Sequence, residues 1–492
     1  MTTKLARAAL PQLLATAAVP SYDAGQLSPG IVHFGVGNFH RAHQAVYLDD
    51  LFNLGLDGDW GIIGAGVRPA DDLMRGKLQA QDWLTTVVEQ EADSAAARVT
   101  ASMIGHLPIG DSAAIIAQLA DPAIRIVSLT ITEGGYYIDP ATQRFDPTHP
   151  DIAADAANFG TPRTVFGLIL AGLRVRREAG MQPFTVMSCD NIPGNGHVTR
   201  NAVVGLAELV DPALAAWVRD TVAFPNGMVD RITPATTDRE RTALAENFGI
   251  DDEWPVFCER FKQWVLEDHF PAGRPALEKV GVQFVPDVAP FEHMKIRILN
   301  GGHATIAYPA ALLDIHFVHE AMEHDLIKAF LRKVEREEII PIVPPVPDTH
   351  LGEYYELIER RFSNPRIGDT ITRLCLDGSN RQPKFILPSA VDRVTAGGSV
   401  QGLALVSAFW ARYCYGTTDS GTPIPPNDPN WDRLTGTARR AKEDPAAWLE
   451  MTDIFGQLAQ QPAYREAFTH ALRTIWTIGT QRTLETYLAG EL

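Results

Sequence analysis

Three polar side chains that can handle a proton or an alkoxide fall within one predicted helix. Residues 291–313 have helical spacing, and a rotation of about 100° per residue places Lys295, Asn300 and His303 on one side of that helix. Burial lowers the pKa of a lysine, so a desolvated Lys295 can serve as a general base. An asparagine amide can donate a hydrogen bond to a developing alkoxide. The pattern predicts removal of a proton from a hydroxyl group.

Neighbouring residues add two conditions to this prediction. Glu292 lies close before Lys295, and a nearby carboxylate raises the pKa of a lysine, so desolvation must outweigh the pairing. Glu292 is also a candidate relay that passes the proton to water. Gly301 and Gly302 each cost a helix about 1 kcal/mol relative to alanine, and we attribute them to close approach of a ligand or of backbone. The alternative is a surface helix with a solvated lysine.

A glycine turn follows the first predicted strand, residues 31–34, and precedes a predicted helix, residues 39–52. In a strand, turn and helix of this kind, backbone amides can approach a pyrophosphate. The third small residue of the usual glycine pattern is replaced by His40, so an ordinary glycine turn is the alternative. The candidate cofactor-binding residues at the turn are Gly35, Val36, Gly37, Asn38 and Phe39.

A carboxylate follows the second predicted strand, residues 61–67. Asp71 at this strand's end can accept hydrogen bonds from an adenosine ribose and repel a 2′-phosphate, which favours NAD over NADP. Arg68 could instead bind a 2′-phosphate, so use of NADP stays open. A solvated loop acid is the alternative interpretation of Asp71.

Asn191 is a second candidate donor to an alkoxide. It follows a predicted buried strand, residues 184–188, and loops at the carboxyl ends of strands commonly carry active-site groups in open α/β sheets. The alternative is an asparagine in a turn, because Pro193 and Gly194 come directly after it.

The elements around these residues predict an α/β fold in two parts. Strands alternate with helices through residues 1–289, which indicates a mostly parallel sheet covered on both faces. From Pro290 to residue 492 nearly every patterned segment has helical spacing, which predicts a mainly α-helical domain. The predicted strands are 31–34, 61–67, 84–89, 124–132 and 184–188, and the N-terminal helices include 112–119 and 164–176.

Charge and hydropathy exclude some partners. The 492 residues include 43 Lys and Arg against 60 Asp and Glu, a net charge of −17. Nucleic acids are bound largely by Lys and Arg that neutralise phosphates, so no nucleic-acid partner is expected. The apolar stretches 124–131 and 403–410 are shorter than the ~20 residues of a membrane span. We expect a soluble protein in which residues 8–19 form a helical extension.

Cysteine spacing and missing motifs narrow the chemistry. The four cysteines match neither a disulfide framework nor a CxxC metal motif, which favours a reducing cytoplasm. No tyrosine stands four residues before a lysine, so the Tyr-Lys pair of short-chain dehydrogenases is absent. There is also no compelling zinc-ligand cluster, serine nucleophile elbow or phosphate-binding Gly-Lys-Ser/Thr loop. We expect metal-free hydride transfer with a lysine base.

Over nearly its whole length the chain resembles the polyol-specific long-chain dehydrogenases. The resemblance rests on residues 35–43, 131–136, 188–191, 224–234 and 295–303. It implies a Rossmann-type dinucleotide-binding domain with insertions in residues 1–289, a helical substrate-binding domain in residues 290–492, and a cleft where NAD meets an open-chain polyol. The relatives are often monomers, so a monomer is expected.

The resemblance also implies roles for individual residues. Lys295 would be the general base, with Asn191 and Asn300 holding the alkoxide and Glu292 serving the proton path. Residues implied to contact substrate hydroxyls are His303, Asp230 and Arg373.

One position departs from the family pattern, because Arg381 stands where the family has a substrate-contacting lysine. A guanidinium is no simple substitute for an ammonium, and two arginines could bind the carboxylate of a sugar acid. We expect NAD-dependent oxidation of D-mannitol to D-fructose and the reverse. The alternatives are fructuronate reduction, arabinitol or sorbitol oxidation, and a non-catalytic NAD sensor.

Overall fold

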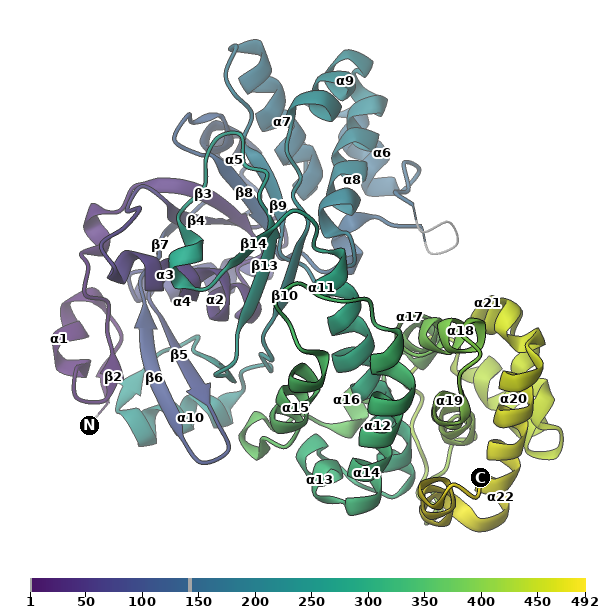
Figure 1. Cartoon of the computed structure of the whole chain (residues 1–492). Helices are drawn as coiled ribbons and strands as arrows, with labels where there is room; N and C mark the ends of the chain where they lie inside the picture. The colour runs from purple at the N-terminus through teal and green to yellow at the C-terminus, as the bar shows by residue number, and fades with distance from the viewer. Residues whose placement is uncertain (1, 140–143) are drawn as a thin grey trace. The chain divides into compact units, whose positions relative to one another are not determined.

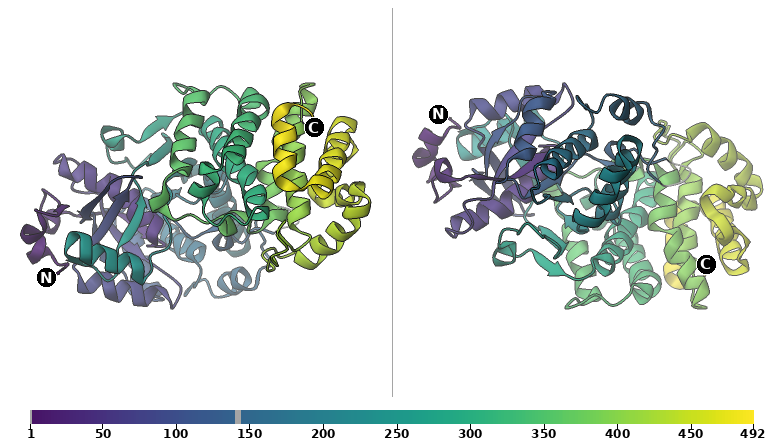
Figure 2. Two further views of the ribbon diagram at one scale, coloured as in Figure 1. Left: turned by 90° about the horizontal axis from the view of Figure 1, so that it is seen from below. Right: turned by 90° about the horizontal axis from the view of Figure 1, so that it is seen from above.

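The computed structural model describes residues 2–139 and 144–492, and it divides into two compact units, Met1–Ala289 and Pro290–Leu492. Strands occur in the first unit, drawn purple to teal, whereas the green-to-yellow unit is helical (Figures 1 and 2). The predicted α/β fold with a mainly helical C-terminal part is confirmed.

A five-stranded parallel sheet forms the centre of the first unit, in the order β7-β4-β3-β8-β9. Both faces are buried: Val32 and Val127 join the apolar cluster of α5, α7, α8 and α9, whereas Ile31 and Ile126 join that of α3 and α4. Along the chain, β4 and β7 are added on one side of β3, and β8 and β9 are then added on its other side. The strand order therefore reverses between β3 and β8. Ligands of open α/β sheets bind at such a reversal, outside the carboxyl ends of the strands. The strands are β3 (Pro29–Phe34), β4 (Gly61–Ala65), β7 (Met103–His106), β8 (Ile126–Leu129) and β9 (Thr185–Ser188).

The helices of the first unit cover this sheet and its neighbours. The predicted helix 39–52 is interrupted at His43, whose backbone angles are φ −120° and ψ −89°, so it forms two helices, α2 and α3. The helices are α1 (Leu10–Leu13), α2 (Asn38–Ala42), α3 (Gln44–Asn53), α4 (Asp71–Ala80), α5 (Ser112–Ala120), α6 (Pro150–Ala157), α7 (Val165–Glu178), α8 (Asn195–Val210), α9 (Pro212–Thr221) and α10 (Asp238–Phe248).

Three smaller sheets complete the unit, in the orders β12-β5-β6-β2, β10-β13-β14 and β1-β11. Their strands are β1 (Thr3–Lys4), β2 (Ala17–Ala18), β5 (Thr85–Gln90), β6 (Ala95–Thr100), β10 (Gly227–Asp230), β11 (Ile250–Asp251), β12 (Val256–Glu259), β13 (Gln263–Glu267) and β14 (Gln283–Val285).

Two local predictions differ from the structure. The strand predicted at 84–89 is confirmed as β5, but it forms an antiparallel hairpin with β6 and pairs with the distant β12 instead of joining the central sheet. The helical extension predicted over 8–19 is wrong beyond Leu13, because only a 3₁₀ turn (Arg7–Ala9) and α1 are helical, and β2 then pairs with β6. Leu13 and Ala17 are buried in the core of that small sheet.

The second unit packs its helices around α12 and α19, which are buried on nearly all sides. Two segments, Lys295–Asn300 and Glu335–Ile339, are π-helices. Its α-helices, apart from α11 (Ala289–Met294) at the border, are α12 (Gly301–Leu312), α13 (Val318–Glu323), α14 (Asp325–Val334), α15 (Leu351–Phe362), α16 (Ile371–Cys375), α17 (Gly378–Phe385), α18 (Leu387–Thr395), α19 (Gln401–Tyr413), α20 (Trp431–Glu443), α21 (Thr452–Phe455) and α22 (Pro462–Ala489).

The four cysteines are free and buried, and burial raises the pKa of each thiol. Within residues 2–139 and 144–492, no helix has the length and apolar character needed to cross a membrane.

Candidate functional site

The two glycines of the turn after β3 serve different purposes. Gly35 has a φ of +93°, and a Cβ there would lie 2.1 Å from the carbonyl oxygen of Thr130 at the end of β8. Only glycine fits at that position. A Cβ at Gly37 would meet nothing closer than the Gly35 oxygen at 3.9 Å, so the exposed surface over Gly37 has room for a ligand. The turn lies between the ends of β3 and β8, where the strand order reverses, and its shape fits a dinucleotide.

Asp71 stands beyond the end of β4, in the first turn of α4. Its carboxylate accepts a hydrogen bond from the backbone amide of Arg68 at 3.2 Å and pairs with the Arg68 guanidinium at 3.3 Å. The Asp71 side chain is 15% exposed and that of Arg68 is 72% exposed. A Cβ at Gly66 would lie 2.8 Å from the Asp71 carboxylate, so glycine makes room for the acid. The position suits a hydroxyl-binding carboxylate, with the mostly exposed Arg68 side chain paired to it.

The polar side chains that follow the glycine turn are built into the fold. His40 is buried and stacks on His33 with ring centroids 3.5 Å apart, and burial lowers the pKa of His33 to about 3. The fully buried Arg41 donates to the side-chain oxygen of Asn38 at 2.8 Å and to the backbone oxygen of Trp254.

Three cofactor candidates at this turn remain: Val36 is buried, and Asn38 and Phe39 also contact the fold. The Asn38 amide donates to the backbone oxygen of Pro234 and the hydroxyl of Thr236, each at 3.2 Å. Phe39 stacks on His43 with ring centroids 4.8 Å apart. These side chains position the turn, whose backbone remains the part suited to a cofactor.

Asn191 and Asp230 lie at the ends of two strands in different sheets of the first unit. Asn191 is exposed in the loop after β9, and Asp230 is the buried last residue of β10. The buried Asn195 amide donates to the backbone oxygens of Asp190 and Gly227, at 3.1 and 2.8 Å, and so ties this loop to the start of β10. Arg231, which sequence reasoning alone would pair with Asp230, forms its ion pair with Glu89 at 2.6 Å.

In the second unit, Lys295 and Asn300 begin and end the first π-helix. π-Turns inside α-helices are frequent at functional sites, and their wider turn changes the angles assumed for a regular helix. Lys295 is 7% exposed, and Glu292 lies half-buried in α11. The Asn300 Oδ1 and His303 Nε2 atoms are buried and have no hydrogen-bond partner in the described parts of the chain. Two unsatisfied polar atoms thus lie about a turn apart on this segment.

His303 is held as a neutral ring. It stacks on Phe362 with ring centroids 4.0 Å apart. Burial lowers the pKa of His303 to about 3, Asp369 opposes this shift, and Arg373 and Arg381 add to it. A neutral imidazole can accept a hydrogen bond at one nitrogen and donate at the other.

The two candidate arginines differ in what they offer a substrate. Arg373 makes a two-pronged ion pair with Asp369, at 2.5 Å for each contact. Arg381 donates to the backbone oxygens of Leu374 and Arg373, at 2.8 and 3.3 Å. The charge of Arg373 is therefore already matched by a carboxylate, whereas Arg381 contacts neutral carbonyls.

The glycines after Asn300 are explained by packing inside the unit. A Cβ at Gly301 would lie 3.3 Å from the backbone oxygen of Phe385, as expected for close approach of backbone. At Gly302 it would lie 3.2 Å from a carboxylate oxygen of Glu335 and 3.4 Å from the Phe362 ring. The expectation of a ligand or backbone neighbour is therefore wrong for Gly302, which makes room for side chains.

Glu335 lies at the start of the second π-helix and is fully buried. Neither of its carboxyl oxygens has a hydrogen-bond partner within residues 2–139 and 144–492. Burial raises the pKa of Glu335 well above its usual value, so the folded protein holds it as a neutral acid.

Glu335→Gln is expected to stabilise the protein increasingly as pH rises. Above a pH of about 4.5 the unfolded chain loses a proton that the fold retains, so wild-type stability falls by about 1.4 kcal/mol per pH unit until the folded-state pKa is reached. Glutamine does not ionise, so the variant lacks this pH-dependent loss of stability. Urea unfolding at pH 5, 6.5 and 8 checks the prediction, with the exposed Glu337→Gln as control. A gap between Glu335→Gln and wild type that stays constant with pH would contradict it.

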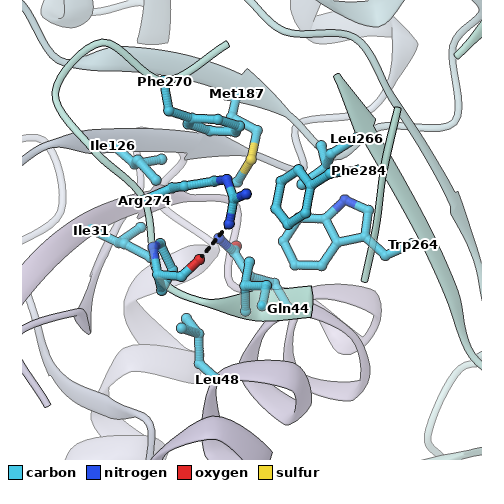
Figure 3. A pocket seen from close by; sticks show the side chains of 12 residues that line it. Ile31, Gln44, Leu48, Ile126, Met187, Trp264, Leu266, Phe270, Arg274 and Phe284 are labelled. Atoms are coloured by element: carbon cyan, nitrogen blue, oxygen red, sulfur yellow. Dashed lines mark hydrogen bonds between the residues drawn. The ribbon is translucent and has the colours of Figure 1, made fainter. Parts of the chain in front are cut away.

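A cavity on the α3 side of the central sheet is not a substrate site. Figure 3 shows Met187, Trp264 and Phe284 around it, with Arg274 across it. The Arg274 guanidinium stacks 3.4 Å from the Phe284 ring centroid. About 10 Å³ of free volume remains, room for about one water molecule.

Sequence reasoning assigned no role to Asp369, which pairs with Arg373, or to Glu335, which lies against Gly302. Of these, Asp369 had a usable signal, because it precedes Arg373 by four residues, the spacing of helical ion pairs. In the described parts of the chain no group of three or more His, Cys, Asp or Glu side chains is arranged to hold a metal ion.

Comparison with known proteins matches almost the whole chain to two domain families. Residues 29–279 match the mannitol dehydrogenase Rossmann domain, and residues 287–476 match the mannitol dehydrogenase C-terminal domain. A mannitol 2-dehydrogenase of Cereibacter sphaeroides is 64% identical over 472 residues, which cover 96% of this chain and 98% of the relative.

Two solved structures have the same fold over their whole length. Pseudomonas fluorescens mannitol 2-dehydrogenase, in a ternary complex with NAD and D-mannitol, is 42% identical with a TM-score of 0.87, covering 99% of this chain and 100% of its own. A substrate-free D-sorbitol dehydrogenase is 34% identical with a TM-score of 0.91, covering 98% and 100%. With both domain families matched in order along the sequence, the chain belongs to the mannitol dehydrogenase family.

Proposed function

We propose that the protein interconverts D-mannitol and D-fructose with NAD as cofactor and without a metal. The observation that carries the proposal is the second unit's polar row: a buried Lys295, then the unpartnered Asn300 and His303 atoms on the same helical segment. The domain match and the ternary complex of the Pseudomonas fluorescens relative with NAD and D-mannitol support the same choice.

In the proposed reaction Lys295, in its neutral form, takes the proton of the substrate's C2 hydroxyl. NAD would be held against Gly37 and Asp71, where it would accept the hydride released as the C2–H bond breaks and C2 becomes a carbonyl carbon. Asn191 and Asn300 donate hydrogen bonds to the substrate's C2 oxygen as its negative charge develops. For this the Asn300 side-chain amide rotates, so that its nitrogen, which can donate, takes the place of its unpartnered oxygen. Glu292 passes the proton from Lys295 to water.

The proposal extends to the residues that contact the substrate. The neutral His303 ring can bind a hydroxyl, and we assign Asp230, Arg373 and Arg381 to further hydroxyls. The Asp369 partner of Arg373 argues against fructuronate, because a second carboxylate would compete for the same guanidinium. We further propose that the chain works as a monomer in the cytoplasm, in line with its four free thiols.

The decisive experiment compares D-fructose with D-fructuronate in NADH oxidation at neutral pH, with and without EDTA. Faster turnover of fructose, unchanged by EDTA, is the expected result. Faster turnover of fructuronate would transfer the assignment to sugar-acid reduction, and loss of activity in EDTA would contradict the metal-free mechanism. Binding of NADH with no turnover of any ketose or polyol would indicate a non-catalytic sensor. Assays of D-sorbitol and D-arabinitol oxidation rank the remaining polyols.

A further inference from the structure

The turn after β8 adjoins the glycine turn after β3. The Thr130 hydroxyl donates to the backbone oxygen of Gly35 at 2.5 Å, and the Thr130 carbonyl occupies the space that a Cβ on Gly35 would need. Residues 130–132 therefore form the second wall of the crevice in which a dinucleotide is expected to bind, on the side of β8.

Thr132 in this wall has a backbone conformation that suits glycine. Its φ of +62° and ψ of 166° lie in a region that β-branched residues rarely enter. The residue is exposed at the carboxyl edge of the sheet, so no tight core packing forces it there. Such outliers cluster at binding and active sites, where surrounding contacts hold them in place.

Asp190 supplies the contacts that hold this turn. Its two carboxyl oxygens accept the backbone amides of Thr132 at 2.8 Å and Ile131 at 2.9 Å, and one also accepts the Tyr136 hydroxyl at 2.7 Å. Tyr136 in turn contacts the Ser188 hydroxyl at 2.6 Å. Burial raises the pKa of Asp190, and the three donors act against that shift. All donors point at one buried carboxyl group.

The same residue borders the proposed alkoxide donor. Asp190 comes directly before Asn191, and its backbone oxygen accepts the Asn195 amide that also binds the start of β10. A movement of Asp190 would therefore shift the Thr132 turn and the Asn191 loop together.

We propose that Asp190 is a positioning residue, which holds the Thr132 turn in its strained conformation and thereby fixes the cofactor wall in register with Asn191. The role of Asn191 rests on the proposed function, whereas the effect on cofactor binding does not. A glycine at position 132 would adopt the same angles without strain, but it would also leave them easily. Because the Asp190 carboxylate holds Thr132, residues 130–132 keep a single conformation.

The test compares Asp190→Asn with a matched control, Asp155→Asn. Asp155 is likewise buried and accepts two consecutive backbone amides, those of Arg163 and Thr164, at 2.8 and 2.9 Å, and the Thr164 hydroxyl at 2.6 Å. Asp155 lies in α6, and its donors belong to the residues just before α7 rather than to the turn after β8. Both substitutions place an amide hydrogen where an acceptor is needed, so both are expected to lower the thermal unfolding midpoint.

Only Asp190→Asn is expected to weaken binding of NADH, followed by its fluorescence, and to lower kcat of the folded enzyme, on the order of 10-fold to 100-fold for misalignment of this kind. Equal losses of stability in the two variants with wild-type NADH affinity and kcat would overturn the proposal. Weakened NADH binding in a protein whose wild type reduces no ketose would support the positioning role while contradicting the proposed function.

If Asp190→Asn does not fold, Thr132→Gly tests whether the rigid Thr132 turn is needed for cofactor binding and turnover. This variant keeps every contact of Asp190 with the backbone but loosens the turn. Unchanged thermal stability with a roughly tenfold loss of NADH affinity or kcat is expected. Wild-type values of both would overturn the proposal.

Discussion

Lys295→Ala is expected to lower kcat for D-mannitol oxidation by about 10²-fold to 10⁴-fold, the range that general acid–base catalysis contributes. Alanine removes the atom that takes the hydroxyl proton and leaves the glycine turn and Asp71 of the other unit untouched. NADH affinity and the thermal unfolding midpoint should therefore remain close to wild type. Steady-state kinetics and an NADH fluorescence titration measure the two effects separately.

A lysine at the surface provides the control for this variant. Lys279→Ala removes an exposed ammonium group from a short 3₁₀ turn and should leave kcat unchanged. Added small primary amines should restore part of the activity of Lys295→Ala, since they can fill the space and take the proton. Near-normal turnover in Lys295→Ala without any amine would show that another group is the base.

Gly35→Ala is expected to prevent folding or to destabilise the first unit by about 4 kcal/mol or more, a loss that single substitutions seldom reach. The added methyl group would lie 2.1 Å from the Thr130 carbonyl oxygen, and the backbone at φ +93° disfavours any side chain. Neither strain can be relieved without moving β3 away from β8. Soluble yield and urea unfolding measure the loss.

Gly37→Ala is the matched partner of Gly35→Ala. Its methyl group meets no atom closer than 3.9 Å, so the variant should fold normally and show its defect only in a weaker affinity for NADH. Wild-type stability in Gly35→Ala would contradict the packing argument, and wild-type NADH affinity in Gly37→Ala would contradict the cofactor placement.

Local patterns in the sequence predicted the parts of the fold that depend on neighbours in the chain. The apolar runs that become β3, β4, β8 and β9 are bounded by turn residues, and each was located to within a few residues. The glycine turn and the polar row at Lys295, Asn300 and His303 were also visible, because glycine spacing and helical periodicity are short-range signals.

Features that depend on distant partners could not be predicted. Nothing near residues 84–89 reveals that β5 pairs with β12, more than 160 residues away in the chain. The π-helix that contains Lys295 has a wider turn than an α-helix, but it is only six residues long, too short for side-chain periodicity to reveal it. Likewise Asp190 reads as a turn residue until the fold brings Thr132 and Ile131 to its oxygens.

The family motif around Asn38–Ala42 contains residues that serve the fold as well as residues at the cofactor turn. His40 and Arg41 are buried and contact other parts of the first unit, so they identify the fold more directly than the chemistry. Arg373 and Arg381, which we propose to contact the substrate, lie on short helices of the second unit that showed no distinctive pattern in the sequence.

The four buried thiols give the folded chain almost no reactivity toward maleimides or disulfide reagents at neutral pH. A thiolate is the reactive species, and each cysteine has both a raised pKa and no access to solvent. Modification of these native cysteines therefore reports on opening of the core that surrounds each of them. A single cysteine introduced at an exposed position would accept a fluorophore or spin label selectively, with all native cysteines left in place.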